Sequence, residues 1–347
     1  MSENNKKATP LSDLGEFGLI KKLTEPFKIK SSSVVKGIGD DAAIIKPNDN
    51  EILVTTDLLA EGVHFDLVYT PLQHLGYKAV IANLSDIYAM GGKPMHITVS
   101  LAVSSKFSVE ALEQLYDGIR RACERYNVDL IGGDTTSSLT GLIISITAIG
   151  EVEKGKSILR NGAKAGDLVC VSGDLGGAYA GLQILKRERE VYMINPNSQP
   201  DLSKYDYVIG RQLKPEARRE VIDMIKQSGL TPTAMIDISD GLSSELLHIC
   251  KQSGCGVKIY ESKLPVDPQT EAVATELNMD ATLIAMNGGE DYELLFTIPA
   301  EQVEIAGNMA GISIIGQITN EPEVYTLMGR VAGSTRISAQ GWEAYKK

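Results

Sequence analysis

The stretch HITVSLAVSSKFSVEALEQLYDGIRRACERYNVDLIGGDTT, residues 96–136, contains three successive hydrophobic patterns. Its first part, His96–Val103, alternates apolar and small polar residues, which is typical of a β-strand. Ser108 then precedes a segment with helical spacing of apolar residues that reaches Tyr126, and Ser is a common N-cap. A short apolar run, Val128–Ile131, follows. Strand, helix and strand in this order predict a mixed α/β unit.

The same patterns extend in both directions along the chain. Before residue 154 they predict three more strands and a second helix, at Ala42–Ile45, Ile52–Thr56, Leu142–Val152 and Leu72–Met90. The polar, glycine-bearing segment 154–167 is typical of a domain boundary. Beyond it we expect strands at Leu168–Ser172, Ala234–Ile238, Val257–Glu261, Tyr292–Ile298 and Ser313–Ile318, helices through Arg187 and at Pro215–Gln227 and Leu242–Gln252, and a surface loop at 187–206. The chain therefore predicts two α/β domains, residues 1–152 and 153–347.

Composition limits the possible classes of function. The 347 residues suit two domains, and 43% apolar with 23% charged residues are typical of a folded globular protein. Subtracting 45 acidic from 34 basic residues leaves a net charge of −11, which disfavours binding to nucleic acid or to an anionic membrane. The polar start MSENNKKATP and the lack of a long apolar run indicate a cytoplasmic protein. The four cysteines form no C-x-x-C pair, so we interpret them as reduced thiols rather than zinc ligands.

Aspartates recur where strand-like runs end, or beside Gly, Ser or Thr. They are Asp40 and Asp41 in GIGDDAAII, Asp57 in ILVTTD, Asp86 in ANLSDIYAMGG, Asp134 in LIGGDTT, and Asp237 and Asp240 in IDISDG. A hairpin centred on residue 49 would bring Asp41 and Asp57 together at its open end. Asn83 and Asp86 are three residues apart and share a helix face, so Asp86 can complete the same cluster.

The ligand types in this set favour one kind of metal. Carboxylates without His or Cys suit Mg²⁺ better than zinc or copper, and Mg²⁺ often shares its ligands with substrate phosphates. Each aspartate taken singly is more often a turn or cap residue, and that structural interpretation stays open. No P-loop sequence and no H-R-D with D-F-G is present, which argues against P-loop NTPases and protein kinases. The segment GDLGGA, residues 173–178, is either a phosphate cradle or only a tight strand-to-helix turn.

Longer motifs resemble those of thiamine-monophosphate kinases. They are GEFGLI, GIGDDAA, VTTDLLAEGVHF, KAVIANLSDIYAMGGKP, LIGGDTT, ILRNGAKAGD, IDISDGLSSEL and NGGEDYELLF, and the resemblance runs from about Gly15 to Trp342. It implies an N-terminal α/β domain whose sheet forms a β-barrel with a dimer mate, a C-terminal α/β domain, and an active site in the cleft between them. The implied reaction is phosphorylation of thiamine monophosphate by ATP, giving thiamine diphosphate, in a homodimer.

The resemblance also implies roles for individual residues. The candidate ligands of several Mg²⁺ ions are Asp41, Thr55, Thr56, Asp57, Asp86, Asp134, Asp237 and Asp240. The candidate ATP contacts are Tyr116, Gly133, Asp134, Arg160 and Ser239. The candidate substrate contacts are His64, Glu290 and Trp342. An indole face beside a carboxylate suits the thiazolium cation of the substrate. Because the sequence offers no obvious nucleophile for a phosphoenzyme, we expect direct in-line transfer assisted by the metal ions.

Other functions share parts of this pattern. One alternative is a related cyclo-ligase or selenophosphate synthetase; the latter carries a reactive Cys or selenocysteine near its N-terminus, whereas the first 122 residues here contain no Cys. A related hydrogenase-maturation protein ends in Cys, whereas this chain ends GWEAYKK. A non-catalytic Mg-nucleotide-binding regulator is the alternative from another class. Intact aspartates in every motif argue against it, and an ATP turnover assay decides.

Overall fold

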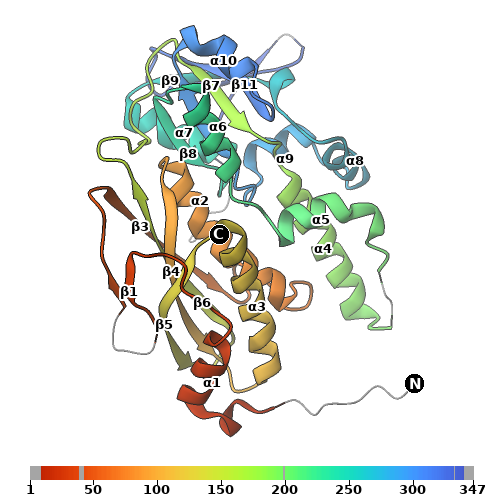
Figure 1. Ribbon diagram of the computed structural model, residues 1–347. Helices are drawn as coiled ribbons and strands as arrows, with labels where there is room; N and C mark the ends of the chain where they lie inside the picture. Colours follow the sequence, from red (N-terminus) through yellow and green to blue (C-terminus); the bar gives the residue numbers. More distant parts are fainter. Residues whose placement is uncertain (1–8, 39–42, 198–199, 332, 340–347) are drawn as a thin grey trace. The chain divides into compact units, whose positions relative to one another are not determined.

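The computed structural model describes residues 9–38, 43–197, 200–331 and 333–339 (Figure 1). The chain divides into two compact units: Met1–Ile87 with Gly92–Gly155, and Tyr88–Gly91 with Lys156–Lys347. Both units combine helices with a sheet, so the predicted two-domain α/β class is confirmed. No helix in the described ranges is long and apolar enough to cross a membrane.

The first unit is built on a four-stranded sheet with the order β3-β6-β4-β5. Its strands are Glu51–Ala60 (β3), Lys93–Val103 (β4), Asp129–Ser137 (β5) and Ile143–Val152 (β6). β6 is antiparallel to β3 and to β4, whereas β4 and β5 are parallel and are joined by a helix. In β6, Ile144, Ile146 and Ala148 are buried and the residues between them are partly exposed, so the sheet has one core face.

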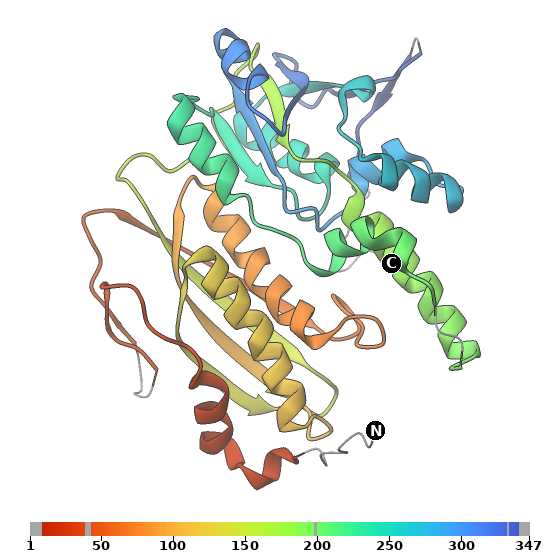
Figure 2. The ribbon, with the colours of Figure 1, turned by 45° about the vertical axis from the view of Figure 1, so that its right-hand side comes forward.

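Two long helices, Leu72–Ala89 (α2) and Val109–Tyr126 (α3), cover this core face (Figures 1 and 2). The predicted N-cap of α3 is confirmed, because Ser108 Oγ accepts a hydrogen bond from the Ala111 N–H at 3.3 Å. The two helices approach closely at Gly76, where a Cβ would lie 2.0 Å from the Leu115 carbonyl oxygen. Only glycine fits such a contact. A shorter helix, Gly15–Thr24 (α1), packs against α3 and follows a 3₁₀ turn, Leu11–Asp13.

The other face of the sheet exposes apolar side chains along β3. Ile52, Val54 and Leu58 are 46%, 65% and 56% exposed. β3 and β5 are the two edge strands, so the described strands form an open sheet and no closed barrel. The barrel with a dimer mate is therefore not confirmed, because closing it would require strands from outside this chain.

The predicted hairpin around residue 49 is wrong. Ile44–Ile45 (β2) pairs with Val34–Lys36 (β1). β3 instead pairs with β6 along its whole length, from Glu51 opposite Val152 to Ala60 opposite Ile143. The ladder between β3 and β6 spans ten residue pairs, whereas β2 has only two residues. Asp40 and Asp41 lie outside the described residues, so no statement about their position follows.

The second unit is built on a seven-stranded sheet with the order β13-β12-β9-β11-β7-β10-β8. Its strands are Leu168–Ser172 (β7), Ala234–Asp237 (β8), Gly256–Tyr260 (β9), Leu294–Ile298 (β10), Ile312–Thr319 (β11), Tyr325–Met328 (β12) and Ser334–Arg336 (β13). Neighbouring strands are antiparallel except β12 and β9. The core includes Val171, Ile236, Leu246 and Leu295, together with the thiols of Cys250 and Cys255. All four cysteines of the chain are buried and free.

The helices of this unit depart from the predictions in two places. They are Gly177–Ile194 (α4), Asp206–Leu213 (α5), Arg219–Ser228 (α6), Leu242–Ser253 (α7), Pro268–Glu276 (α8), Ala281–Asn287 (α9) and Val303–Gly307 (α10), with 3₁₀ turns at Ser203–Tyr205, Glu261–Lys263 and Ala300–Gln302. α4 continues to Ile194, into the predicted loop, because no Gly or Pro interrupts the helix before Pro196. α6 begins at Arg219 rather than at Pro215, because Arg218 leaves helical geometry, with φ −86° and ψ 52°.

The strand that follows the GGEDYE residues also begins later than predicted. β10 starts at Leu294 rather than at Tyr292. Glu290 and Tyr292 have φ values of 67° and 51°, which no β-strand accommodates. Residues 288–293 therefore form an irregular connection (the turn 288–293) between α9 and the strand.

Candidate functional site

In the first unit, β3 and α2 bring two aspartates together. Thr55 Oγ1 donates a hydrogen bond to Asp86 Oδ2 at 2.5 Å, and the Asp57 N–H donates to Asn83 Oδ1 at 3.2 Å. Thr55 and Asp57 point to one face of the strand, because they are two residues apart. Asn83 and Asp86 share a face of α2, as predicted. Carboxylate, hydroxyl and amide oxygens therefore gather where β3 meets α2.

Burial makes a negative charge on Asp57 unfavourable. Burial first, and then the charge of Asp86, raise the pKa of the Asp57 carboxyl from 3.8 to about 6. A divalent cation would offset both effects, because it attracts two carboxylates and replaces lost hydration. The oxygen donors named above fit Mg²⁺. Within the described ranges, however, no group of three or more His, Cys, Asp and Glu side chains is placed to hold a metal ion.

Thr56 points away from this pair. Its Oγ1 donates to the Ile146 carbonyl oxygen at 3.1 Å and lies 3.1 Å from Thr147 Oγ1 on the next strand. Both contacts are on the face opposite Thr55 and Asp57, because side chains alternate along a strand. The hydroxyls of Thr55 and Thr56 therefore do not converge, and the role of Thr56 in metal binding stays a prediction.

Asp134 and Gly133 lie on the edge strand β5. The ladder aligns Leu58, Ser145, Ser100 and Asp134 in one row across the four strands. Asp134 therefore shares the face of Leu58, not that of Asp57, and the described chain does not bring it beside Asp57 and Asp86. At Gly133 a Cβ would lie 2.0 Å from the Val99 carbonyl oxygen, so the close approach of β4 already requires this glycine.

His64 lies in the turn that follows β3. Its Nδ1 accepts a hydrogen bond from the Ala60 N–H at 3.0 Å. The neutral ring therefore carries its proton on Nε2, where it can act as a hydrogen-bond donor. This tautomer suits a contact with a phosphate, and the contact itself stays a prediction.

Tyr116 lies on α3 where this helix faces α1. It is 7% exposed, and its ring meets that of Phe27 edge-on with centroids 6.2 Å apart. Lys22, Pro26 and Arg120 are among the residues that line a cavity of about 170 Å³ beside it. Burial raises the pKa of Tyr116 to about 12, so the hydroxyl stays protonated. The packing fits a core tyrosine, and contact with ATP stays a prediction.

In the second unit, the end of β8 and the turn 288–293 form a second group. Asp237 ends the strand and is 3% exposed. The loop after it is tied to the turn, because the Glu290 N–H donates to the Ser239 carbonyl oxygen at 2.7 Å and the Tyr292 N–H donates to that of Ile238 at 2.9 Å. The structure therefore brings Ser239 and Glu290 together, with Asp240 next in the chain.

A buried glutamate supports the same loop. Glu245 on α7 is 2% exposed, and its Oε1 accepts a hydrogen bond from the Asp240 N–H at 2.9 Å. Burial raises the pKa of Glu245 to about 7, and its hydrogen bond with the Asp240 backbone opposes that rise. Burial and then Arg160 lower the pKa of His248, while burial raises the pKa of Asp240 and His248 opposes the rise. Arg160 and Asp240 therefore both affect the pKa of His248 on α7, in opposite directions.

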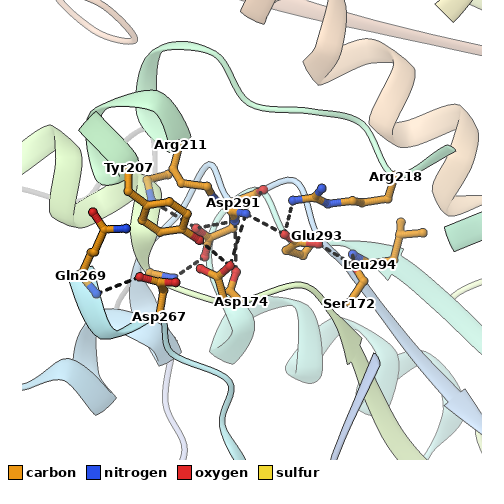
Figure 3. A network of polar contacts seen from close by, with 12 residues as sticks. Ser172, Asp174, Tyr207, Arg211, Arg218, Asp267, Gln269, Asp291, Glu293 and Leu294 are labelled. Carbon is orange, nitrogen blue, oxygen red and sulfur yellow. Dashed lines mark hydrogen bonds and ion pairs between the residues drawn. The ribbon is translucent and has the colours of Figure 1, made fainter. Parts of the chain in front are cut away.

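A third group of carboxylates is buried and paired with arginines of the same chain (Figure 3). Arg211 Nη1 lies 2.9 Å from Glu293 Oε1, and Arg211 Nη2 lies 3.5 Å from Asp291 Oδ1. Arg218 forms a second hydrogen-bonded ion pair with Glu293. The side chains of Asp291 and Glu293 are 0% exposed. Because buried charges require partners, this network serves the stability of the unit.

The GDLGGA segment belongs to the same network. The N–H groups of Gly176 and Ala178 donate to the Asp291 carboxylate at 2.7 and 3.3 Å. The N-terminus of α4 is therefore already capped by a carboxylate of this chain. The geometry supports the tight-turn interpretation and not a phosphate cradle.

Sequence reasoning missed Glu245, Arg211 and Gln212. A signal for Glu245 exists, because IDISDGLSSEL places it in the first turn of a helix, where a carboxylate can reach backbone N–H groups. The two arginine pairs with Glu293 join residues 82 and 75 positions apart, so no local pattern indicates them. Trp342, like Asp41, lies outside the described residues.

Comparison with known families gives two matches along the chain. Residues 39–152 match the N-terminal domain of AIR synthase related protein, and residues 164–328 match its C-terminal domain. Among curated relatives, the thiamine-monophosphate kinase of Bacillus subtilis is 36% identical over 96% of this chain and 100% of its own length.

Solved structures show the same relationship. The thiamine-monophosphate kinase of Stenotrophomonas maltophilia K279a superposes with a TM-score of 0.78 at 31% identity, covering 92% of this chain and 98% of the other. The structure of AaThiL complexed with AMPPCP and TMP gives a TM-score of 0.74 at 32% identity, covering 96% and 98%.

Proposed function

We propose, because the chain belongs to the thiamine-monophosphate kinase family, that it transfers the γ-phosphoryl group of ATP to thiamine monophosphate and releases thiamine diphosphate and ADP. The observation that carries the proposal is the 36% sequence identity to a thiamine-monophosphate kinase along the whole length of that protein. The pair Asp57 and Asp86 would hold Mg²⁺ for such a transfer. An oxygen of the substrate phosphate forms the new bond to the γ-phosphorus as the bond to the β-phosphate oxygen breaks, so no covalent enzyme intermediate is needed.

The first unit is proposed to hold Mg²⁺ for this reaction. When bound, Mg²⁺ screens the repulsion between two polyanions and stabilises the charge of the transferring group. Asp57 and Asp86 would hold it, and Thr55 keeps the Asp86 carboxylate oriented through its 2.5 Å hydrogen bond. Asp41, Thr56 and Asp134 are the other proposed ligands from the first unit, and Asp237 and Asp240 are proposed as ligands from the second unit.

The remaining proposed contacts concern the two substrates. Glu290 is a counter-charge for the thiazolium ring, and His64 donates from Nε2 to the substrate phosphate. The only Trp of the chain, Trp342, is proposed to cover the ring. For ATP the proposed contacts are Tyr116, Gly133, Asp134, Arg160 and Ser239.

A homodimer is proposed for the first unit. The exposed apolar residues of β3 and the open edges of the sheet support it, because such surfaces are usually covered in a soluble assembly. A second copy of the sheet would close a barrel. Light scattering should give a mass near twice 37.4 kDa at micromolar concentration, and a stable 37.4 kDa species contradicts the proposal.

The activity test measures ADP and thiamine diphosphate with Mg²⁺, with and without thiamine monophosphate. We expect both products in equal amounts, only when the acceptor is present. ADP released with inorganic phosphate, or at the same rate without the acceptor, contradicts the kinase assignment. Nucleotide binding without any turnover indicates a regulator instead.

A further inference from the structure

Helix α5 reaches the turn 288–293 with two adjacent side chains of different chemistry. Arg211 contacts Glu293 and Asp291, the inward-pointing carboxylates of the turn (Figure 3). Gln212 is 4% exposed, and its Nε2 donates a hydrogen bond to Glu290 Oε2 at 2.8 Å. One helix therefore contacts all three acidic side chains of the turn.

The backbone of this turn is strained and firmly held. Left-handed backbone geometry at Glu290 and Tyr292 is unfavourable for residues other than glycine, so surrounding contacts must maintain it. The two N–H bonds to the loop after β8 fix one side of the turn, and Arg211 fixes the other. Glu290 therefore leaves the turn in a defined direction, and its side chain is oriented by Gln212.

The two α5 side chains act differently on charge. Arg211 pairs with two carboxylates whose side chains are fully buried. Gln212 has no charge, so it orients the Glu290 carboxylate without adding a positive charge beside it. A carboxylate that must attract a cation benefits from this kind of donor, because an arginine in its place would compete with the cation.

We propose that Gln212 is a positioning residue that sets the Glu290 carboxylate for the cationic ring of the substrate, through the hydrogen bond from Nε2 to Oε2. The inference rests on the proposed function, because it concerns how thiamine monophosphate is recognised. It adds that Gln212 orients the Glu290 carboxylate, and that the side chain in this position must be uncharged.

Two substitutions test the hydrogen bond and the charge separately. Gln212→Met keeps the volume and removes the donor, and we expect KM for thiamine monophosphate to rise about three- to tenfold, as for loss of one hydrogen bond to a charged group. Gln212→Lys keeps a donor and adds a charge, so we expect a larger rise. In both variants kcat and KM for ATP should change less than about twofold. Gln302→Met, which removes two exposed hydrogen bonds with Thr231 elsewhere in the same unit, is the control and should leave both KM values unchanged.

A double-mutant cycle and an analogue separate positioning from packing. If Gln212 acts through Glu290, Gln212→Met should add nothing to KM in a Glu290→Gln background. Binding of an analogue whose ring carries carbon in place of the thiazolium nitrogen should be insensitive to either Gln212 variant. Additive effects, or equal loss of the cationic and neutral ligands, overturn the proposal. If the unaltered chain forms no ADP with thiamine monophosphate but binds it with this Gln212 dependence, the proposed function fails and the inference stands.

Discussion

Two groups of buried carboxylates differ in what opposes their negative charge. Beside β3, burial and the charge of Asp86 act in the same direction and raise the pKa of Asp57 to about 6. In the second unit, burial and, less strongly, the charge of Glu293 raise the pKa of Asp291 to about 7, although Arg211 and the N–H groups of Gly176 and Ala178 oppose the rise. The second group is therefore only partly compensated, but its partners come from this chain. The first fits an added cation.

The comparison shows that acidic residues at strand ends do not by themselves mark a metal site. Asp291 and Glu293 lie in the motif NGGEDYE, directly before a strand, and would count as candidates by position alone. The tertiary structure gives them guanidinium partners and a helix N-terminus, which makes them structural. The useful criterion is the nature of the nearest charges, not the number of carboxylates.

The largest expected effect is on stability, from a substitution in the group that contains Asp291 and Glu293. Arg211→Met should lower the free energy of unfolding of the second unit by about 3–5 kcal/mol, because it removes the guanidinium beside Asp291 and leaves Glu293 with Arg218 alone. Urea titration followed by circular dichroism measures this. The control is Arg187→Met, whose ion pair with Glu276 is partly exposed and should cost no more than about 1 kcal/mol. Similar losses in the two variants would remove the distinction between buried and surface pairs.

The next largest effect is expected on kcat, from a substitution of Asp57 in the group beside β3. Asp57→Asn keeps the size of the side chain and removes its charge, so kcat should fall about 10²- to 10³-fold at saturating Mg²⁺. Steady-state ADP release measures this. Asp49→Asn, at an exposed turn residue before β3, is the matched control and should retain full activity. Near-normal kcat for Asp57→Asn would sink the metal assignment.

Asp57→Asn, although it lowers kcat, should raise the stability of the metal-free protein at neutral pH. The folded pKa of Asp57 lies above its usual value, so its contribution to stability is present at low pH and is lost as pH rises through about 6. Metal-free Asp57→Asn should therefore be more stable than the unaltered chain at pH 7.5, by about 1–2 kcal/mol after screening by solvent, with little difference at pH 4. Denaturation in EDTA at both pH values tests this. A gain that does not depend on pH contradicts the electrostatic explanation.

The smallest expected effect is on stability, from the Tyr207–Asp174 hydrogen bond beside the Arg211 network. Tyr207 donates to Asp174 Oδ2 at 2.5 Å, so Tyr207→Phe should cost about 1 kcal/mol of stability. Thermal unfolding measures the loss. KM for thiamine monophosphate should stay within about twofold, because this bond does not contact Glu290. A substantial rise in KM would indicate that the Arg211 network takes part in substrate binding, which would contradict its assignment as purely structural.

Local patterns predicted the elements with a strong period of their own. α3 with its Ser108 cap and the strands β4, β6 and β7 lie close to where alternation or helical spacing placed them. The hairpin at residue 49 was wrong because turn residues indicate a reversal but not which strand becomes the partner. The late starts of α6 and β10 were missed because Arg218 and residues 290–292 follow tertiary contacts against local preference.

The sequence by itself determined the two-domain α/β class, the motifs that indicate the family, and the pairing of Asn83 with Asp86 on one helix face, because these depend on residue types at short spacing. Only the tertiary structure decided which carboxylates meet arginines, which face of the sheet carries Asp134, and that Gln212 contacts Glu290, 78 positions away. Charge compensation depends on burial and on distances in space. Residues far apart in the chain set those distances, and their packing is not written in any local pattern.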